Sequence, residues 1–171
     1  ALTTFDEGII AMLPLSARPG HLRSLLVTLD RAQLGKKTDV SKPLHGLADT
    51  VKKRGMVVLI SDLLDDPDHV IDGLRHFRFR RTDVVVFHIV GPDELTFPFE
   101  RASKFRDMEQ GDELMAVPSV VRASYIAEVE RVFEIYRREL SSAGVDYRLL
   151  NTSEPLEFAL MSYLSNRSRF M

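Results

Sequence analysis

The chain has 171 residues, of which 44% are apolar and 28% charged, and its formal net charge is −2. This size and composition are typical of a globular domain with one sizeable core, and the near-neutral charge excludes a global field that favours nucleic acid or an anionic membrane. The absence of cysteine excludes disulfides, thiolate metal sites and a cysteine nucleophile. No apolar run approaches the roughly 20 residues that span a bilayer, so we expect a cytoplasmic location and no membrane contact from this segment.

The beginning of the chain predicts a β-hairpin followed by two helices. Residues 2–6 and 9–13 are short β-type runs around a glycine-containing turn, which is typical of a tight hairpin. Leucines spaced by three and four predict a helix over 21–34, and a second apolar stripe predicts one over 43–54. Because the chain starts at Ala1 without methionine and enters strand-like sequence at once, we expect a natural N-terminal part to precede it.

The middle of the chain predicts two buried strands with a helix between them. MVVLISD (56–62) and DVVVFHIV (83–90) are almost continuously apolar, which is typical of strands buried on both faces of a parallel sheet. Between them, Asp66 and Pro67 are typical of the cap and first position of a helix, which the apolar spacing extends over 67–79.

The last third predicts an antiparallel hairpin inserted near 104–117, before the alternation of helix and strand resumes. A continuous apolar stripe predicts a long helix over about 119–143, packed against one sheet face. A strand over 145–150 and a final helix over 155–167 follow. Alternating strands and helices with buried parallel strands predict an α/β fold, a Rossmann-like, doubly wound and mostly parallel sheet with helices on both faces.

Ligands of such sheets bind beyond the carboxyl ends of the strands. Asp62 is the carboxylate best placed at that edge, and Thr38, in the loop before the helix at 43–54, is the best-placed hydroxyl. Oxygen ligands of this kind suit a hard cation such as Mg²⁺. For Asp66 the capping role is favoured, and Asp65 is interpreted as a solvated turn residue. The residues alone support Asp62 equally as a metal ligand and as an ordinary polar strand end.

The stretches MVVLISDLLDDP (56–67) and DVVVFHIVGPDELTFPFE (83–100) resemble a bacterial von Willebrand factor A-like domain, of the uncharacterised family found beside MoxR-type AAA+ ATPases. The resemblance implies a metal-ion-dependent adhesion site in which Thr38 and Asp62 are ligands of Mg²⁺ or Mn²⁺. It also implies that residues 1–171 are a single domain lacking its first strand and first helix, with the Asp-x-Ser-x-Ser loop of the site upstream of Leu2. We therefore expect an incomplete site with no tightly bound ion, in a parent protein that could be membrane-anchored.

The implied absence of the first strand has a structural consequence. In the resembled domains that strand lies between the strand at 2–6 and the strand at 56–62, so two sheet edges would be exposed and prone to aggregation. The neighbouring strands could pair directly, another chain could supply a strand, or the hairpin at 1–14 could pair elsewhere. We expect one of the last two, including a homo-oligomer through the exposed edges, because unmet backbone groups inside a sheet are costly.

Two functions remain open from the sequence. The first, implied by the resemblance, is a non-enzymatic protein-interaction module, the partner of a MoxR-like AAA+ ATPase in the assembly or maturation of other proteins. The second is a metal-dependent phosphoryl-transfer or nuclease-type enzyme that uses Asp62, Asp65 and Asp66. Two-metal chemistry needs carboxylates that converge on metals about 4 Å apart, whereas these acids bunch on one turn, which favours the first. The basic run RHFRFRR (75–81) is interpreted as cations at a helix carboxyl end, and no nucleic-acid partner is expected.

Overall fold

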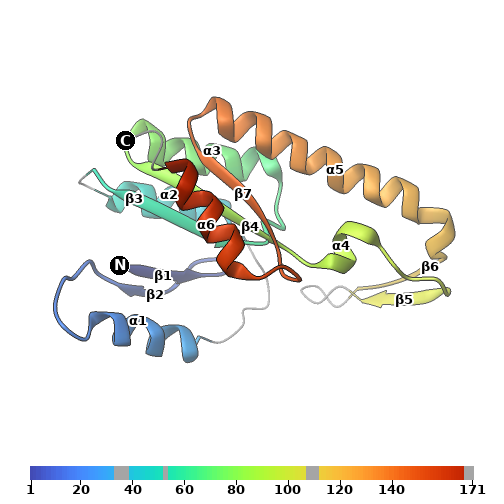
Figure 1. The fold of residues 1–171 in the computed structure, drawn as a ribbon, viewed down its shortest axis with the longest axis horizontal. Coiled ribbons are helices and arrows are strands. Elements are labelled where there is room, and N and C mark those ends of the chain that lie inside the picture. Colours follow the sequence, from blue (N-terminus) through green and yellow to red (C-terminus); the bar gives the residue numbers. More distant parts are fainter. Residues whose placement is uncertain (33–38, 52–53, 107–111, 168–171) are drawn as a thin grey trace.

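The computed structural model describes residues 1–32, 39–51, 54–106 and 112–167. Strands and helices alternate along most of the chain, and Figure 1 shows their arrangement. In chain order the elements are β1 (Leu2–Phe5), β2 (Ile9–Leu13), α1 (His21–Asp30), α2 (Ser41–Thr50), β3 (Met56–Ser61), α3 (Pro67–Phe79), β4 (Asp83–Val90), α4 (Pro92–Thr96), β5 (Ser103–Arg106), β6 (Glu113–Ala116), α5 (Pro118–Ser142), β7 (Asp146–Asn151) and α6 (Leu156–Arg167).

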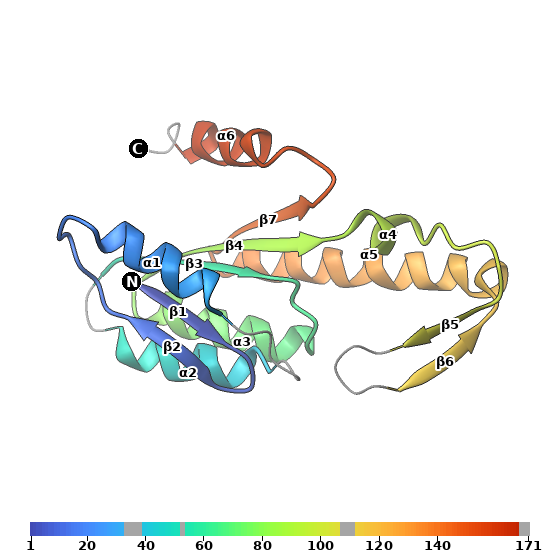
Figure 2. The ribbon, with the colours of Figure 1, turned by 90° about the horizontal axis from the view of Figure 1, so that it is seen from below.

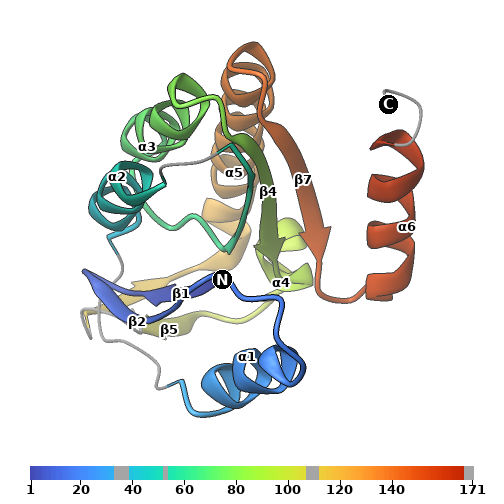
Figure 3. The same cartoon turned by 90° about the vertical axis from the view of Figure 1, so that its left-hand side faces the viewer.

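A parallel sheet of three strands, in the order β3-β4-β7, forms the centre of the fold. Ser61 at the end of β3 pairs with His88 of β4, and Val90 at the end of β4 pairs with Asn151 of β7. The carboxyl ends of the strands therefore meet at one edge. Helices α3 and α5 cover one face and α6 lies over the other (Figure 3). This confirms the predicted α/β fold with helices on both faces of a parallel sheet.

Strand β4 is buried on both faces, as its apolar run predicts. On one face Val86 belongs to the main core with Leu74 of α3 and Tyr136 of α5. On the other face Phe87 packs edge-on against Tyr163 of α6, with ring centroids 5.6 Å apart. The central strand is thus fixed by apolar contacts from both layers.

Strand β3 contradicts the prediction of burial on both faces. Leu59 faces the core and is buried, but Met56, Val58 and Ile60 on the opposite face are 51%, 47% and 66% exposed. Tyr163 of α6 reaches the start of the strand, where its hydroxyl lies 3.9 Å from the sulfur of Met56. Over the rest of that face the described residues place no covering helix, and β3 pairs on one side only, with β4.

The first two strands form a separate hairpin. β1 and β2 pair with each other in antiparallel register, and in the described part of the chain neither pairs with β3. The predicted hairpin is therefore confirmed, and the direct pairing of its first strand with β3 is not what the structure adopts. A groove of about 250 Å³ separates the two, lined by Leu2, Phe5 and Met12 of the hairpin and by side chains of α2 and β3. The hairpin lies beside α2 and α1, and α1 buries none of its own residues (Figure 2).

Only the second half of helix α5 packs on the sheet. This corrects the prediction that the whole apolar stripe of the helix does so. Phe133, Tyr136 and Leu140 of the second half are buried, whereas the first half extends past the strand ends toward α4 and the β5–β6 hairpin (Figure 2). There the guanidinium of Arg122 donates to the carbonyl of Phe97 at 3.0 Å. The inserted hairpin predicted near 104–117 is confirmed by the antiparallel pairing of β5 with β6.

The basic run lies at the carboxyl end of α3, as predicted, and its arginines form ion pairs and hydrogen bonds within the described part of the molecule. Arg75 pairs with Glu139 of α5 at 2.9 Å, Arg80 pairs with Asp49 of α2 at 2.8 Å, and Arg78 donates to the carbonyl of Thr82 at 3.0 Å.

None of the described helices is both long enough and apolar enough to cross a bilayer.

Helices α2 and α3 approach closely at Gly73. A Cβ at this position would lie 2.9 Å from the Cβ of Leu44, whereas a Cβ at Gly46 of α2 would meet no other described atom within 4 Å. The helix α2 ends at Thr50 and not near residue 54 as predicted, and the Thr50 hydroxyl donates to the carbonyl of Leu47 at 2.7 Å.

We therefore expect Gly73→Ala and Gly46→Ala to change stability in opposite directions. Alanine favours a helix over glycine by about 1 kcal/mol, so Gly46→Ala should raise the free energy of unfolding by up to that amount. At Gly73 the gain is outweighed by overpacking against Leu44, and we expect a net loss of about 1–2 kcal/mol. Urea denaturation of both variants measures the difference. Two variants that are equally stable would show that the helices do not approach as closely as described.

Candidate functional site

Asp62 follows β3 directly and lies at the carboxyl edge of the sheet, as the sequence predicts. Its side chain is exposed, and the one hydrogen bond that the described residues give its carboxylate comes from the hydroxyl of Ser61 at 3.4 Å. A cleft of about 240 Å³ opens beside it. The cleft is lined by the polar side chains of Asp62, His88, Glu94, Tyr125 and Glu128 and by apolar side chains of β4, α5 and the loop after β3.

The other two acids that follow β3, Asp65 and Asp66, have structural roles. Asp66 caps α3, as predicted, by accepting a hydrogen bond from the main-chain N–H of Asp68 at 2.9 Å. Asp65 is not the solvated turn residue that the sequence suggests. Its carboxylate accepts the N–H of Val40 at 3.0 Å and the N–H of Asp66 at 2.7 Å. Val40 is fully buried, so Asp65 ties the start of α2 to the loop after β3.

The backbone next to Asp62 is held in an uncommon conformation. Leu63 has a φ of 51°, in the left-handed region that non-glycine residues seldom adopt. Its N–H donates to the hydroxyl of Ser61 at 3.1 Å, its carbonyl accepts the N–H of Asp65 at 2.8 Å, and its side chain is buried. The hydroxyl of Tyr136 lies 3.5 Å from the same carbonyl. These contacts fix the direction in which the chain leaves the strand and thereby the position of Asp62.

His88 connects the cleft to the core. Its ring is buried among the rings of Phe133, Tyr136 and Tyr147, each roughly perpendicular to it. Nδ1 lies 2.7 Å from the hydroxyl of Tyr147, and the ring also hydrogen-bonds the main chain of Asp62. Burial lowers the pKa of His88, although the hydrogen bond to Asp62 opposes that shift. A neutral ring that donates to the Asp62 carbonyl and accepts from Tyr147 satisfies both contacts. His88 is therefore a packed histidine of the core.

The tyrosine in this pair is suited to the role of donor. Burial raises the pKa of Tyr147 far above its ordinary value, so the hydroxyl keeps its proton. The same cause acts on Tyr136, whose ring stacks on Tyr147 at 6.0 Å. The core beneath the cleft therefore stays uncharged around neutral pH.

The far wall of the cleft comes from residues that the sequence analysis did not single out. A side-chain oxygen of Glu94 in α4 accepts the N–H of Gly91 at 2.8 Å, so this acid anchors its own short helix. The carboxylate of Glu128 accepts two hydrogen bonds from the guanidinium of Arg131, which lower the pKa of this carboxyl. Burial raises the pKa of Tyr125, and the charge of Glu94 adds to that effect. Tyr125 lies on the predicted apolar stripe of α5, and Glu128 follows it by three positions. This helical spacing indicates that the two side chains lie on the same face of α5.

The described residues do not complete a metal site around Asp62. No three histidine, aspartate or glutamate side chains in the described part of the chain are grouped so that they could hold an ion. Thr38, the predicted hydroxyl ligand, lies outside the described residues. Val40, two positions after it in the sequence, is the residue whose N–H binds Asp65. Asp62 therefore offers one carboxylate, and the described residues group no further acids or histidines with it that would complete a site for Mg²⁺ or Mn²⁺.

Comparison with known proteins gives a family and a fold. The model of the family described as "Protein of unknown function DUF58" matches residues 1–133. None of the curated proteins matches the chain. A similar solved structure is the crystal structure of an aerotolerance-related membrane protein from Bacteroides fragilis with multiple mutations to serines. It is 14% identical, the TM-score is 0.52, and the match covers 87% of this chain and 70% of that one, so the likeness concerns the fold.

Proposed function

We infer the function from the premise that the chain belongs to the DUF58 family, whose model matches more than half of it. We propose that it is a non-enzymatic protein-interaction module, von Willebrand factor A-like, that contacts its partner through the strand-end face around Asp62. The observation that carries this proposal is the contrast between three neighbouring acids. Asp65 and Asp66 are occupied by backbone N–H groups, while the carboxylate of Asp62 is exposed beside the cleft.

The same geometry argues against the alternative of a phosphoryl-transfer or nuclease-type enzyme. Such chemistry needs several carboxylates that converge on metal ions, and two of the three candidates here are engaged in capping and loop contacts. His88, the nearest histidine, has both sides of its ring hydrogen-bonded and a lowered pKa. A general base needs a nitrogen within reach of its substrate, which supports binding over catalysis.

In this proposal Asp62 and Thr38 are ligands of a Mg²⁺ or Mn²⁺ ion. The bond between Val40 and Asp65 supports it, because it ties the chain that follows Thr38 to the loop that carries Asp62. A site with so few protein ligands holds an ion weakly. We expect calorimetric titration with either ion to show no saturation in the micromolar range, and the same result for Asp62→Asn. A micromolar or tighter dissociation constant for the unmodified chain would overturn this expectation.

The proposed partner is a MoxR-type AAA+ ATPase, acting in the assembly or maturation of other proteins. We expect the immobilised chain to bind such a purified ATPase in the presence of Mg²⁺, and Asp62→Ala to weaken binding at least tenfold because it removes the exposed carboxylate. Asp112→Asn, which removes an exposed acid near the β5–β6 hairpin, is the matched control and should bind normally. Equal binding by all three proteins, or binding by none, contradicts the proposal.

A further inference from the structure

The outer edge of β7 carries a groove of about 680 Å³. Six consecutive residues, Tyr147 to Thr152, line it. Because successive side chains of a strand point to opposite faces of the sheet, a groove lined by all of them runs along the edge of the strand and not over one face. β7 is an edge strand, since it pairs with β4 alone in the described part of the chain. Its outer N–H and C=O groups therefore border the groove.

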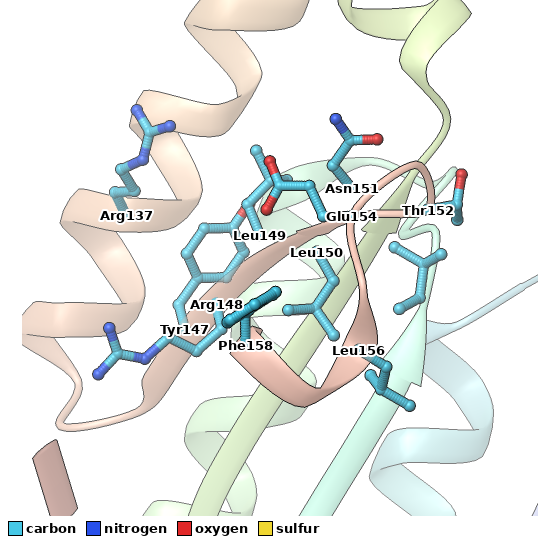
Figure 4. A pocket seen from close by; sticks show the side chains of 11 residues that line it. Arg137, Tyr147, Arg148, Leu149, Leu150, Asn151, Thr152, Glu154, Leu156 and Phe158 are labelled. Atoms are coloured by element: carbon cyan, nitrogen blue, oxygen red, sulfur yellow. The ribbon is translucent and has the colours of Figure 1, made fainter. Parts of the chain in front are cut away.

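Two helices flank this edge. Arg137 of α5 lines the groove from one side of the sheet, and Leu156 and Phe158 of α6 line it from the other. Figure 4 shows Arg137 and Arg148 toward one end of the groove and Leu150 and Leu156 toward the other, the end where Asn151, Thr152 and Glu154 also lie. An occupant that matched the groove would carry an acid toward the arginines and apolar side chains over the two leucines.

At the charged end, Arg148 has a nitrogen without a hydrogen-bond partner among the described residues. This nitrogen, Nε, is buried. An unmet buried donor of a charged group is costly, and an added carboxylate is the acceptor that best relieves it. Arg137 is already paired with Glu134, so Arg148 is the group that selects for an acid. Glu154 also lines the groove and would repel an acidic residue placed beside it.

We propose that this groove binds an extended segment of a partner protein, which adds to β7 as a fourth strand of the main sheet. An acidic side chain of the segment pairs with Arg148, and apolar side chains beyond it pack on Leu150, Leu156 and Phe158. Main-chain hydrogen bonds to an exposed edge supply affinity in this mode of recognition, and the side-chain positions supply specificity. The proposal does not rest on the strand-end face around Asp62, which lies in a separate cleft.

The test uses fluorescein-labelled peptides and the full 171-residue chain. Glu-Asp-Val-Thr-Val-Thr-Val presents its acids to Arg148 if it pairs parallel to β7, and the reversed sequence Val-Thr-Val-Thr-Val-Asp-Glu does so if it pairs antiparallel. We expect one of the two to bind saturably by fluorescence anisotropy and to slow amide exchange in β7. Arg148→Gln should weaken that binding about tenfold. The control Arg101→Gln, which removes an exposed arginine just before β5, should leave it unchanged.

Several results would overturn this inference. Absence of binding by both peptides excludes the added strand, and equal binding of a peptide with Gln-Asn in place of Glu-Asp excludes the role of Arg148. Unchanged binding by Arg148→Gln does the same. Sedimentation that shows a dimer, dissociated by Arg148→Gln and blocking the peptides, would assign the edge to a second copy of the chain. An Asp62→Ala variant that still binds the peptide separates this surface from the strand-end face.

Discussion

Replacing His88 by phenylalanine is expected to lower the free energy of unfolding by about 2–3 kcal/mol at pH 8 and to flatten its pH dependence below about pH 6.5. Phenylalanine preserves the ring packing against Phe133 and Tyr136, but it leaves the hydroxyl of Tyr147 and the carbonyl of Asp62 without their partner. Buried polar groups that lose a partner cost about 1–3 kcal/mol each. Tyr147→Phe leaves one buried group, Nδ1 of His88, without its partner, and should cost about half as much.

The direction of the pH effect follows from the lowered pKa of His88. The unfolded chain takes up a proton near the ordinary histidine value of 6.5, whereas the folded protein resists protonation until a lower pH. The wild-type protein therefore loses stability as the pH falls below about 6.5, and a variant without this imidazole lacks that contribution. Urea denaturation between pH 5 and pH 8 measures it. The matched control is His69→Gln, because His69 is exposed. Parallel pH curves for wild type and His88→Phe would contradict the assignment.

Asp65→Ala is expected to destabilise the protein by about 2–3 kcal/mol, whereas Asp62→Ala changes its stability by no more than about 0.5 kcal/mol. The Asp65 carboxylate accepts two N–H groups, one of them from the fully buried Val40. Its removal leaves that donor unmet and detaches the start of α2 from the loop after β3. The carboxylate of Asp62 is exposed and has one long contact with Ser61, and surface substitutions of this kind are usually small in effect.

Denaturation curves of Asp65→Ala and Asp62→Ala, recorded under the same conditions, measure this difference in the free energy of unfolding. Asp65→Asn keeps one acceptor oxygen and should fall between wild type and Asp65→Ala. If Asp62→Ala were as destabilising as Asp65→Ala, then Asp62 would also be committed to the fold and the proposed interaction face would lose its basis.

The strands and helices of the main sheet could be predicted because their signals are local. The apolar run of β4 and the Asp66-Pro67 start of α3 each depend on neighbouring residues. The exposure of one face of β3 could not be read in this way, because its apolar side chains look the same whether or not another element covers them. Likewise, the sequence does not show how much of α5 packs on the sheet, because the apolar stripe of the helix continues past the end of the sheet. The short helix α4 was missed, although Pro92 at its first position and Glu94 two residues on are a recognisable start.

The candidate site was predictable in part for a similar reason. The position of Asp62 follows from its place at the end of a strand in a parallel sheet. The role of Asp65 depends on Val40, which is 25 positions away, and the state of His88 depends on Tyr147, 59 positions away. Contacts between such distant residues are set by the packing of whole elements, and a single sequence carries no local signal for them.

Helix α5 gives the molecule a mechanical property. At 25 residues it is about 37 Å long, and it is anchored at both ends by unlike contacts: Arg122 grips the carbonyls of Phe97 and Phe99 at one end, and Tyr136 is embedded in the core toward the other. A displacement of the segment around Phe97 would therefore be carried along α5 to Tyr136, whose ring packs edge-on against His88. The helix thus joins the segment before the β5–β6 hairpin mechanically to the histidine whose ring hydrogen-bonds the main chain of Asp62.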